Sequence, residues 1–164
     1  MFTTSISVDQ VIEAVAAFLQ PYCVGAQIVQ AQTNRVAMPP SPCVILTPLN
    51  TSDIATPRVD ALVATAEIRT PTKIDVQVDF YGTLAGDYCR AVSAVMRSSL
   101  ATSAFSQGIS PLYCSDGIQS PLTTGEQQYE NRWTTTLSLQ WSPVVTVPQD
   151  SSNTILLNNI VAVV

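Results

Sequence analysis

The side chains with the chemistry of a catalytic site are few in this sequence, and histidine is absent from it. Without histidine, Ser-His-Asp and Cys-His nucleophile systems are excluded, and carboxylates remain as the acid–base candidates. Asp75 and Asp79 look like a pair, but four residues of an extended strand would separate them by about 13 Å. Because glycosidase carboxyl groups lie about 5 to 9.5 Å apart, we interpret the pair as part of a solvated strand face.

A second group of candidates lies in the polar stretch that precedes the alternating sequence WTTTLSLQW. Glu126, Glu130 and Arg132 carry the charges for a small polar site, but a salt bridge within a loop or a contact between subunits is the more economical explanation. The candidate contact residues of this stretch, called the collar below, are Gly125, Glu126, Gln127, Gln128, Tyr129, Glu130 and Arg132.

Metal and phosphate sites find little support. Cys23, Cys43, Cys89 and Cys114 lack CxxC spacing and have no histidine to complete a zinc site, so we predict buried free thiols. The stretch TLAGD at 83–87 lacks the glycines and lysine of a phosphate loop, and its glycine is predicted to allow close helix packing. We therefore expect no catalytic residue, no metal and no cofactor.

Composition narrows the class of protein further. The chain has 164 residues, enough for one domain, with 12% charged residues and a net charge of −5. Seven Lys and Arg are spread singly, so no basic stripe exists for a phosphate backbone, and sequence-specific nucleic-acid binding is not expected. No apolar run has the length of a membrane span and no signal peptide is visible, so we expect a cytosolic product without membrane contact.

Hydrophobic periodicity predicts the elements that position these side chains. Ser7 and Gln10 form a capping box before an apolar helical stripe, which predicts a helix over 8–19. Strands are predicted over 27–32 and 43–48, followed by a polar segment, 50–64, interpreted as loop.

The second half of the chain also shows clear hydrophobic periods. Strict alternation predicts a strand over 73–80, and Thr83 is predicted to cap a second helix. The apolar face of this helix is predicted to comprise Leu84, Tyr88, Ala91, Val92, Val95 and Leu100. A short strand near 111–114 and a long one from Asn131 follow. This order predicts an α+β fold: a mostly antiparallel sheet with two helices packed on one face, plus an extended C-terminal arm.

The C-terminal segment is the least ordinary part of the sequence. After Pro148, the polar spacer QDSSN leads into an apolar end. An apolar segment exposed to water would promote aggregation, so either this segment packs against the core of its own subunit or it docks on a neighbouring subunit. We expect a domain over 1–150 and a C-terminal arm over 151–164 that docks on an adjacent subunit or another partner protein. Its candidate contact residues are Ile155, Leu156, Leu157, Ile160, Val161, Val163 and Val164.

Four blocks of the sequence resemble one family. They are NRVAMPPSPCVILTPL (34–49), KIDVQVDFYGTLAGDYC (73–89), PLYCSD (111–116) and GEQQYENRWTTTLSLQWSPVVTVPQD (125–150). In order and spacing they resemble the neck or tail terminator proteins of tailed phages, over most of residues 27–150. The combination is specific, whereas one block alone would be weak.

The resemblance implies a structural virion protein that assembles into a ring, expected to be a hexamer, on the last ring of the tail tube. Such a ring stops tube growth, meets the head-side connector or stopper protein and, in contractile tails, the sheath protein. DNA would pass through it without specific binding. The resemblance implies a location at the neck or tail end of the virion, and in the host cytoplasm during assembly.

Two other functions remain open. A head-completion or stopper protein also forms rings at the neck, and is distinguished by its docking partner. A cell-wall carbohydrate-binding or hydrolytic module would require two carboxyl groups converging in a cleft, whereas the candidates here lie mostly on separate elements.

Overall fold

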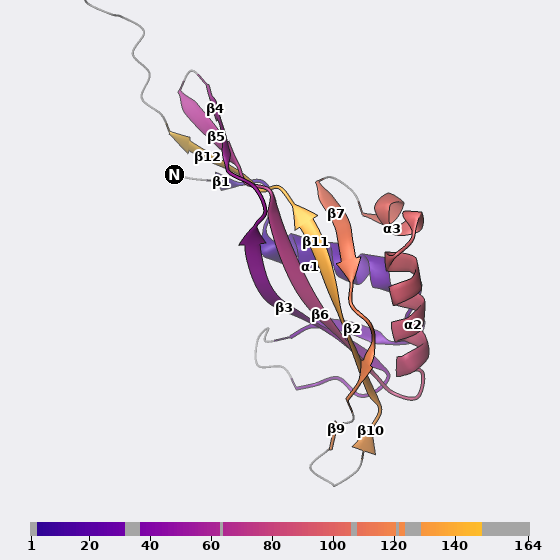
Figure 1. Ribbon diagram of the computed structural model, residues 1–164. Helices are drawn as coiled ribbons and strands as arrows, with labels where there is room; N and C mark the ends of the chain where they lie inside the picture. Colours follow the sequence, from indigo (N-terminus) through magenta and orange to yellow (C-terminus); the bar gives the residue numbers. More distant parts are fainter. Residues whose placement is uncertain are drawn as a thin grey trace, which may run out of the picture.

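A six-stranded sheet, called the main sheet below, forms the centre of the computed structural model, which describes residues 3–31, 37–62, 64–105, 108–120, 122–123 and 129–148. Its strands are ordered β2-β3-β6-β11-β7 (Figure 1), and β8 pairs with β11 on the same edge as β7. Strand β2 runs parallel to β3, and the other pairs are antiparallel. Their bounds are β2 Gln27–Gln30, β3 Cys43–Asp53, β6 Thr72–Tyr81, β7 Ile109–Cys114, β8 Ile118–Gln119 and β11 Arg132–Trp141.

The two central strands, β6 and β11, form because their apolar residues alternate strictly. Val76 lies opposite Leu137 and Ile74 opposite Leu139, so the apolar side chains of both strands lie on one face. These four side chains are fully buried, and each contributes about 1.5 to 3 kcal/mol by leaving water. The predicted strand over 73–80 and the predicted long strand from Asn131 are thus confirmed.

Three helices in the described part of the chain cover that apolar face: α1 Val8–Leu19, α2 Ala85–Met96 and α3 Ser99–Ala104. Their buried residues belong to one core with those of the main sheet. Helix α1 begins at the predicted capping box, in which Ser7 Oγ accepts from Gln10 N–H and the Gln10 side chain accepts from Ser7 N–H. The α+β class and the mostly antiparallel sheet are confirmed, whereas the short helix α3 was not predicted.

Three local predictions were wrong in whole or in part. Leu84, not Thr83, is the N-cap residue of α2, and no side chain caps this helix. Leu84 and Leu100 are exposed and not part of the apolar face, because Leu84 precedes the helix and Leu100 lies on α3. The segment 50–64 is only partly loop: β3 continues to Asp53, residues 54–57 form a loop, and a further strand, β4 (Arg58–Ala61), follows.

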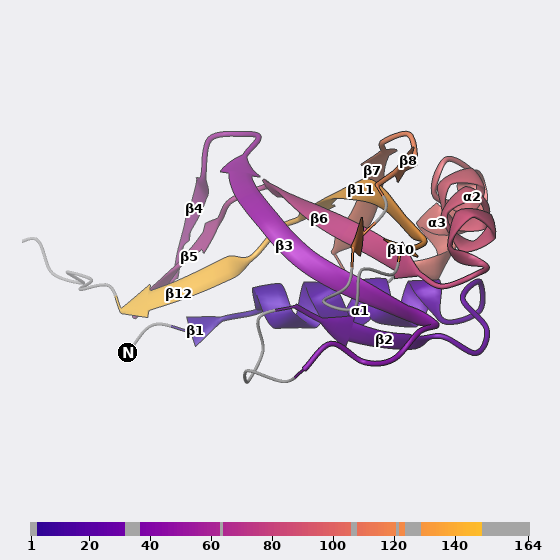
Figure 2. The same ribbon diagram turned by 90° about the horizontal axis from the view of Figure 1, so that it is seen from below.

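A four-stranded sheet, called the outer sheet below, extends from one end of the main sheet, away from α2 and α3 (Figure 2). Its strands are ordered β1-β12-β5-β4, with β1 Thr3–Thr4, β5 Thr65–Arg69 and β12 Val144–Pro148. Strand β5 leads into β6 through Pro71, and β11 leads into β12 through Pro143. Because proline cannot donate a ladder hydrogen bond, the two prolines mark the place where one sheet ends and the other begins.

A two-stranded ladder formed by β9 (Leu122–Thr123) and β10 (Tyr129–Glu130) completes the described strands. It lies directly before β11 in the sequence and at the opposite end of the molecule from the outer sheet (Figure 1). The chain therefore offers two separate extensions of the main sheet, one at each end.

Candidate interaction surfaces

The face of the main sheet opposite the helices carries polar side chains that are paired within the subunit. Arg132 Nε and Nη2 donate to Asp79 Oδ1 at 3.2 and 3.0 Å, and Gln77 Nε2 donates to Asp79 Oδ2 at 2.8 Å. Thr134 Oγ1 also donates to Asp79, and the Arg132 guanidinium lies 5.8 Å from the centre of the Tyr81 ring. Both carboxylate oxygens are therefore hydrogen-bonded, by donors on β11 and on β6 itself.

Asp75 has its own set of partners. Ser138 Oγ donates to it, and Lys73 Nζ lies 3.0 Å from its second oxygen. Burial by itself raises the pKa of Asp75, but the hydrogen bonds from Ser138 and Lys73 and the charge of Lys73 outweigh burial and hold the pKa below its usual value. Asp75 is thus an ion-paired carboxylate.

The interpretation of this face as solvated was wrong for its carboxylates. Only 4% of Asp79 is exposed, because β6 is flanked by β3 and β11 and the long polar side chains of the neighbouring strands cover it. Asp75 and Asp79 also have different partners, so they do not converge on one substrate position.

The structure describes only part of the predicted collar. Gly125, Glu126, Gln127 and Gln128 lie outside the described residues. Tyr129 and Glu130 form β10, and Arg132 is the first residue of β11, with its guanidinium directed to Asp79. Asn131, between the two strands, accepts from Gly82 N–H and donates from Nδ2 to Gly82 O, which fixes the start of β11 against the turn after β6.

The predicted contact residues of the C-terminal arm also lie outside the described residues: Ile155, Leu156, Leu157, Ile160, Val161, Val163 and Val164. A contact role for the collar and for the arm remains a prediction.

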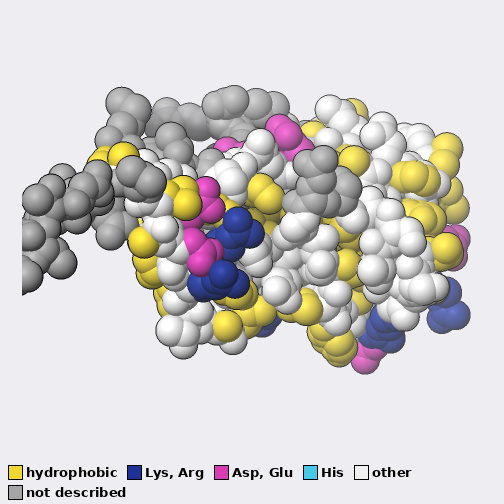
Figure 3. Space-filling view, turned by 90° about the horizontal axis from the view of Figure 1, so that it is seen from above, with side chains coloured by type: hydrophobic (Ala, Val, Ile, Leu, Met, Phe, Trp, Pro, Cys, Tyr) yellow, Lys and Arg dark blue, Asp and Glu magenta, His cyan; other side chains and the backbone are white. Residues whose placement is uncertain are grey.

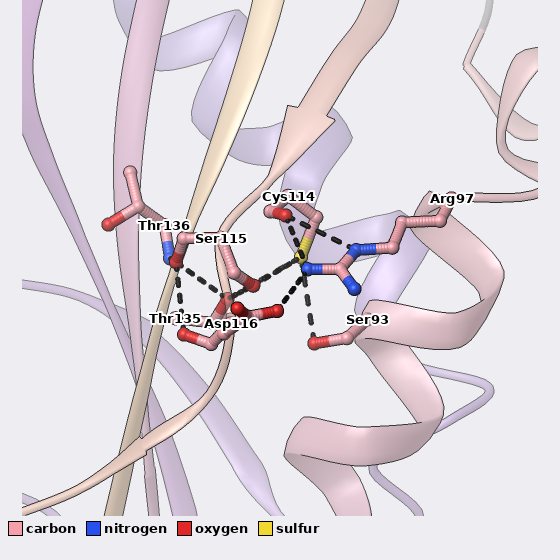
Figure 4. A network of polar contacts seen from close by, with 7 residues as sticks. All are labelled: Ser93, Arg97, Cys114, Ser115, Asp116, Thr135 and Thr136. Atoms are coloured by element: carbon pink, nitrogen blue, oxygen red, sulfur yellow. Dashed lines mark hydrogen bonds and ion pairs between the residues drawn. The ribbon is translucent and has the colours of Figure 1, made fainter.

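A polar network ties α2 to the segment after β7 (Figure 4). Arg97 donates to Cys114 O at 2.9 Å and to Asp116 Oδ1 at 2.7 Å. On the other side, Ser115 Oγ accepts from Thr136 N–H at 2.8 Å, and Thr135 Oγ1 donates to Ser115 O at 2.9 Å. The segment 114–116 is therefore held between α2 and β11.

A surface pocket of about 520 Å³ lies beside this network. It is lined by Gly86, Asp87, Cys89, Arg90, Ser93, Ala94, Arg97, Asp116, Gly117 and Trp133. A Cβ added at Gly86 would lie 3.1 Å from Trp133 Nε1, which confirms that this glycine allows close helix packing. Burial raises the pKa of the Cys89 thiol, so the pocket holds a protonated thiol and not a reactive thiolate.

All four cysteines are free and buried, as predicted. Burial raises the pKa of Cys23 to about 12, with a smaller contribution from the nearby Cys89. Within the described ranges, no three Cys, Asp or Glu side chains lie together as metal ligands would, and no helix there has the length and apolarity to cross a membrane.

The outer sheet has two different faces, because directly opposed residues share a face. Arg58 lies opposite Arg69 and Asp60 opposite Glu67 on one face. The repulsion between these like charges is offset by an ion pair within each strand. Arg58 pairs with Asp60 at 2.9 Å on β4, and Arg69 pairs with Glu67 at 3.5 Å on β5. In Figure 3, basic and acidic side chains likewise lie next to one another, bordered by hydrophobic ones.

The opposite face of the outer sheet is apolar, with Val59, Ala61, Ala66, Ile68, Val145 and Val147. Sequence reasoning missed this sheet, although a signal was present. Arg58 to Ala61 and Ala66 to Arg69 both alternate polar and apolar residues, the pattern of a two-sided strand.

Comparison with known proteins adds one match. A family model described as phage neck terminator protein matches residues 9–162 of the chain. A search of curated proteins found no match.

Proposed function

The chain belongs to the phage neck terminator protein family, and from this premise we propose that it forms a ring, a hexamer, that caps the tail tube and joins it to the head connector. As a member of the family it is a structural protein of the phage neck, located in the virion. The ring, the capping of the tube and the joining to the connector are the proposal. Assembly of the subunits in the host cytoplasm is part of it.

The observation that carries the proposal is the extent of the family match. It runs from residue 9 to residue 162 and so includes the main sheet, every described strand of the outer sheet except β1, the collar and most of the C-terminal arm. We propose that residues 1–150 form the terminator domain and that residues 151–164 form an arm used in assembly. A ring subunit needs two different contact surfaces, and the extensions at the two ends of the main sheet are suitable candidates.

The proposed partners are the neighbouring subunits, the tail tube protein, the head–tail connector or stopper protein and, if the tail is contractile, the sheath protein. We propose that the collar contacts a neighbouring subunit or ring. Arg132 would act there by holding the start of β11, because its charge is engaged by Asp79 within the subunit.

We propose that DNA passes through the ring without specific contacts, along a lumen that is neutral or acidic. Support comes from five of the six cations of the described residues: Arg58, Arg69, Lys73, Arg97 and Arg132 each pair with a carboxylate of the same subunit, whereas the exposed Arg90 does not. Paired cations release few counterions from DNA, so a passing duplex would meet little adhesion.

Purified tail tubes provide the test. The full-length chain should bind one end of the tubes and stop their further growth, and a phage lacking the gene should make tails of unregulated length. A stopper protein would instead bind the head portal complex and leave tube length unchanged. Binding to portal but not to tubes would therefore replace the terminator proposal with the stopper alternative.

The hydrolytic alternative has a test of its own. Alanine at Glu126 and Glu130 should leave any cell-wall hydrolysis unchanged, because we propose no catalytic role for them. Loss of a measured hydrolytic activity in that variant would favour an enzyme instead.

A further inference from the structure

The apolar face of the outer sheet lies outside the hydrophobic core of the subunit. Val59 is 61% exposed and Ala61 is exposed, whereas Ile68, Val145 and Val147 are half-buried and Ala66 is buried. None of these side chains belongs to the core formed by the main sheet and the helices. An amphipathic sheet is normally hydrophobic on the face that packs against another element, so this face requires a partner.

The chain itself carries a segment of matching chemistry. Strand β12 ends at Pro148, within the outer sheet, and residues 149–164 follow it. Seven large aliphatic residues lie between Ile155 and Val164. The five-residue spacer 149–153 spans at most about 17 Å, so the aliphatic residues begin close to an outer sheet and not close to the core.

Two features of β12 favour the outer sheet of another subunit. Strand β5 pairs with β12 along its whole length and β1 pairs with it at Val145 and Thr146, so a hairpin strand returning from Pro148 would meet an edge that is already paired after two residues. In addition, β12 points away from the main sheet (Figure 2), so a return over its own apolar face would require the spacer 149–153 to reverse the direction of the chain.

We propose that the C-terminal arm, residues 151–164, lies on the apolar face of the outer sheet of the adjacent subunit. The inference rests on the proposed ring and names the receptor surface of the arm. Because arm and receptor both belong to the outer-sheet end of the subunit, the same contact can repeat from each subunit to the next. Repetition around a closed ring would leave neither the arms nor the receptor faces uncovered.

Cross-linking between two kinds of subunit tests the proposal. Full-length Val59→Cys and Ile160→Cys chains, distinguishable by mass, are mixed, assembled on purified tail tubes and treated with a short bismaleimide. The four native cysteines are buried, and the unmodified chain gives the background. The expected product is a covalent dimer containing one subunit of each kind.

Asp60→Cys is the matched control for Val59→Cys, because it places the thiol on the same strand but on the charged face. Its yield of dimer with Ile160→Cys should be at least fivefold lower. Equal yields from the two positions would overturn the proposal, as would rings of the doubly substituted Val59→Cys/Ile160→Cys chain that contain links only within a subunit.

A second readout does not depend on cross-linking. Val59→Ser should weaken binding to tube ends by at least fivefold, whereas Asp60→Ser should not, and equal effects would contradict the proposal. If the tubes are capped but the arm does not link to a neighbour, only this inference fails. If the unmodified chain does not cap tubes, the proposed function fails and this inference fails with it.

Discussion

Arg132 and Asp79 are 53 residues apart in the sequence but form an ion pair across β11 and β6, with two donors of the guanidinium on one carboxylate oxygen. Asp79 is buried and Arg132 is half-buried. A buried carboxylate that has lost its cation lowers the free energy of unfolding, so substitution of Arg132 alone should destabilise the subunit.

Arg132→Met should lower the free energy of unfolding by about 2 to 3 kcal/mol, because it leaves the Asp79 charge buried with only neutral donors. Urea denaturation measures the change. The double variant Arg132→Met/Asp79→Asn should recover part of the loss, since it removes the unpaired charge. A double variant less stable than Arg132→Met would show that the pair does not act in this way.

Gly117→Ala should destabilise the subunit by about 1 to 3 kcal/mol, because the added Cβ would lie 2.6 Å from Cys89 Sγ. Thermal unfolding measures the effect. Gly117→Ala combined with Cys89→Ala makes room for the methyl group and should cost less than the sum of the single changes. Additive effects would contradict a contact between these residues.

Stability should fall steeply above pH 9. The folded protein raises the pKa of Cys23 from 9.0 to about 12 and so holds this proton more tightly than the unfolded chain does. The stabilisation is therefore complete below pH 9 and is lost as pH rises from 9 to about 12, with a slope of about 1.4 kcal/mol per pH unit. Cys23→Ala should reduce that slope in urea titrations at successive pH values, and an unchanged slope would exclude Cys23 as its source.

Deletion of residues 151–164 should leave the domain folded and weaken its assembly on tail tubes, because the arm contributes to contacts between subunits. Circular dichroism and tube-capping assays measure the two effects. A chain of unchanged length, with serine in place of the seven aliphatic residues, should behave like the truncation. If the truncated chain unfolds instead, the segment is part of the core.

The chain should bind duplex DNA no more tightly than about 10⁻⁴ M at physiological salt, because the cations of the outer sheet are paired. Fluorescence anisotropy measures the affinity. The variant Asp60→Asn/Glu67→Gln frees Arg58 and Arg69 and should gain binding that weakens with salt. Salt-dependent binding by the unmodified chain at this strength or better would contradict a non-adhesive lumen.

Prediction from the sequence succeeded where one face of an element is buried. Apolar residues recur with a clear period in the helix over 8–19, in the strand over 73–80 and in the strand from Asn131, because one face of each packs against the core. Strands β4 and β5 were missed, because charged side chains alternate with apolar ones that the subunit itself does not fully cover.

The candidate surfaces were harder to predict. The collar was recognised as polar, but the partner of Arg132 was not, since cross-strand register over 53 residues leaves no local signal. The like-charged neighbours Arg58 and Arg69 likewise become apparent only when β4 is aligned with β5.

The outer sheet is connected to the rest of the subunit by continuous strands, yet it shares no hydrophobic core with it. Pro71 and Pro143 interrupt the ladder where the strands cross from one sheet to the other. Local opening of the four outer strands therefore exposes none of the residues that hold the main sheet together. We therefore expect the subunit to unfold as two cooperative units, with amide hydrogens in the outer sheet exchanging faster than those in the main sheet until assembly covers the outer sheet.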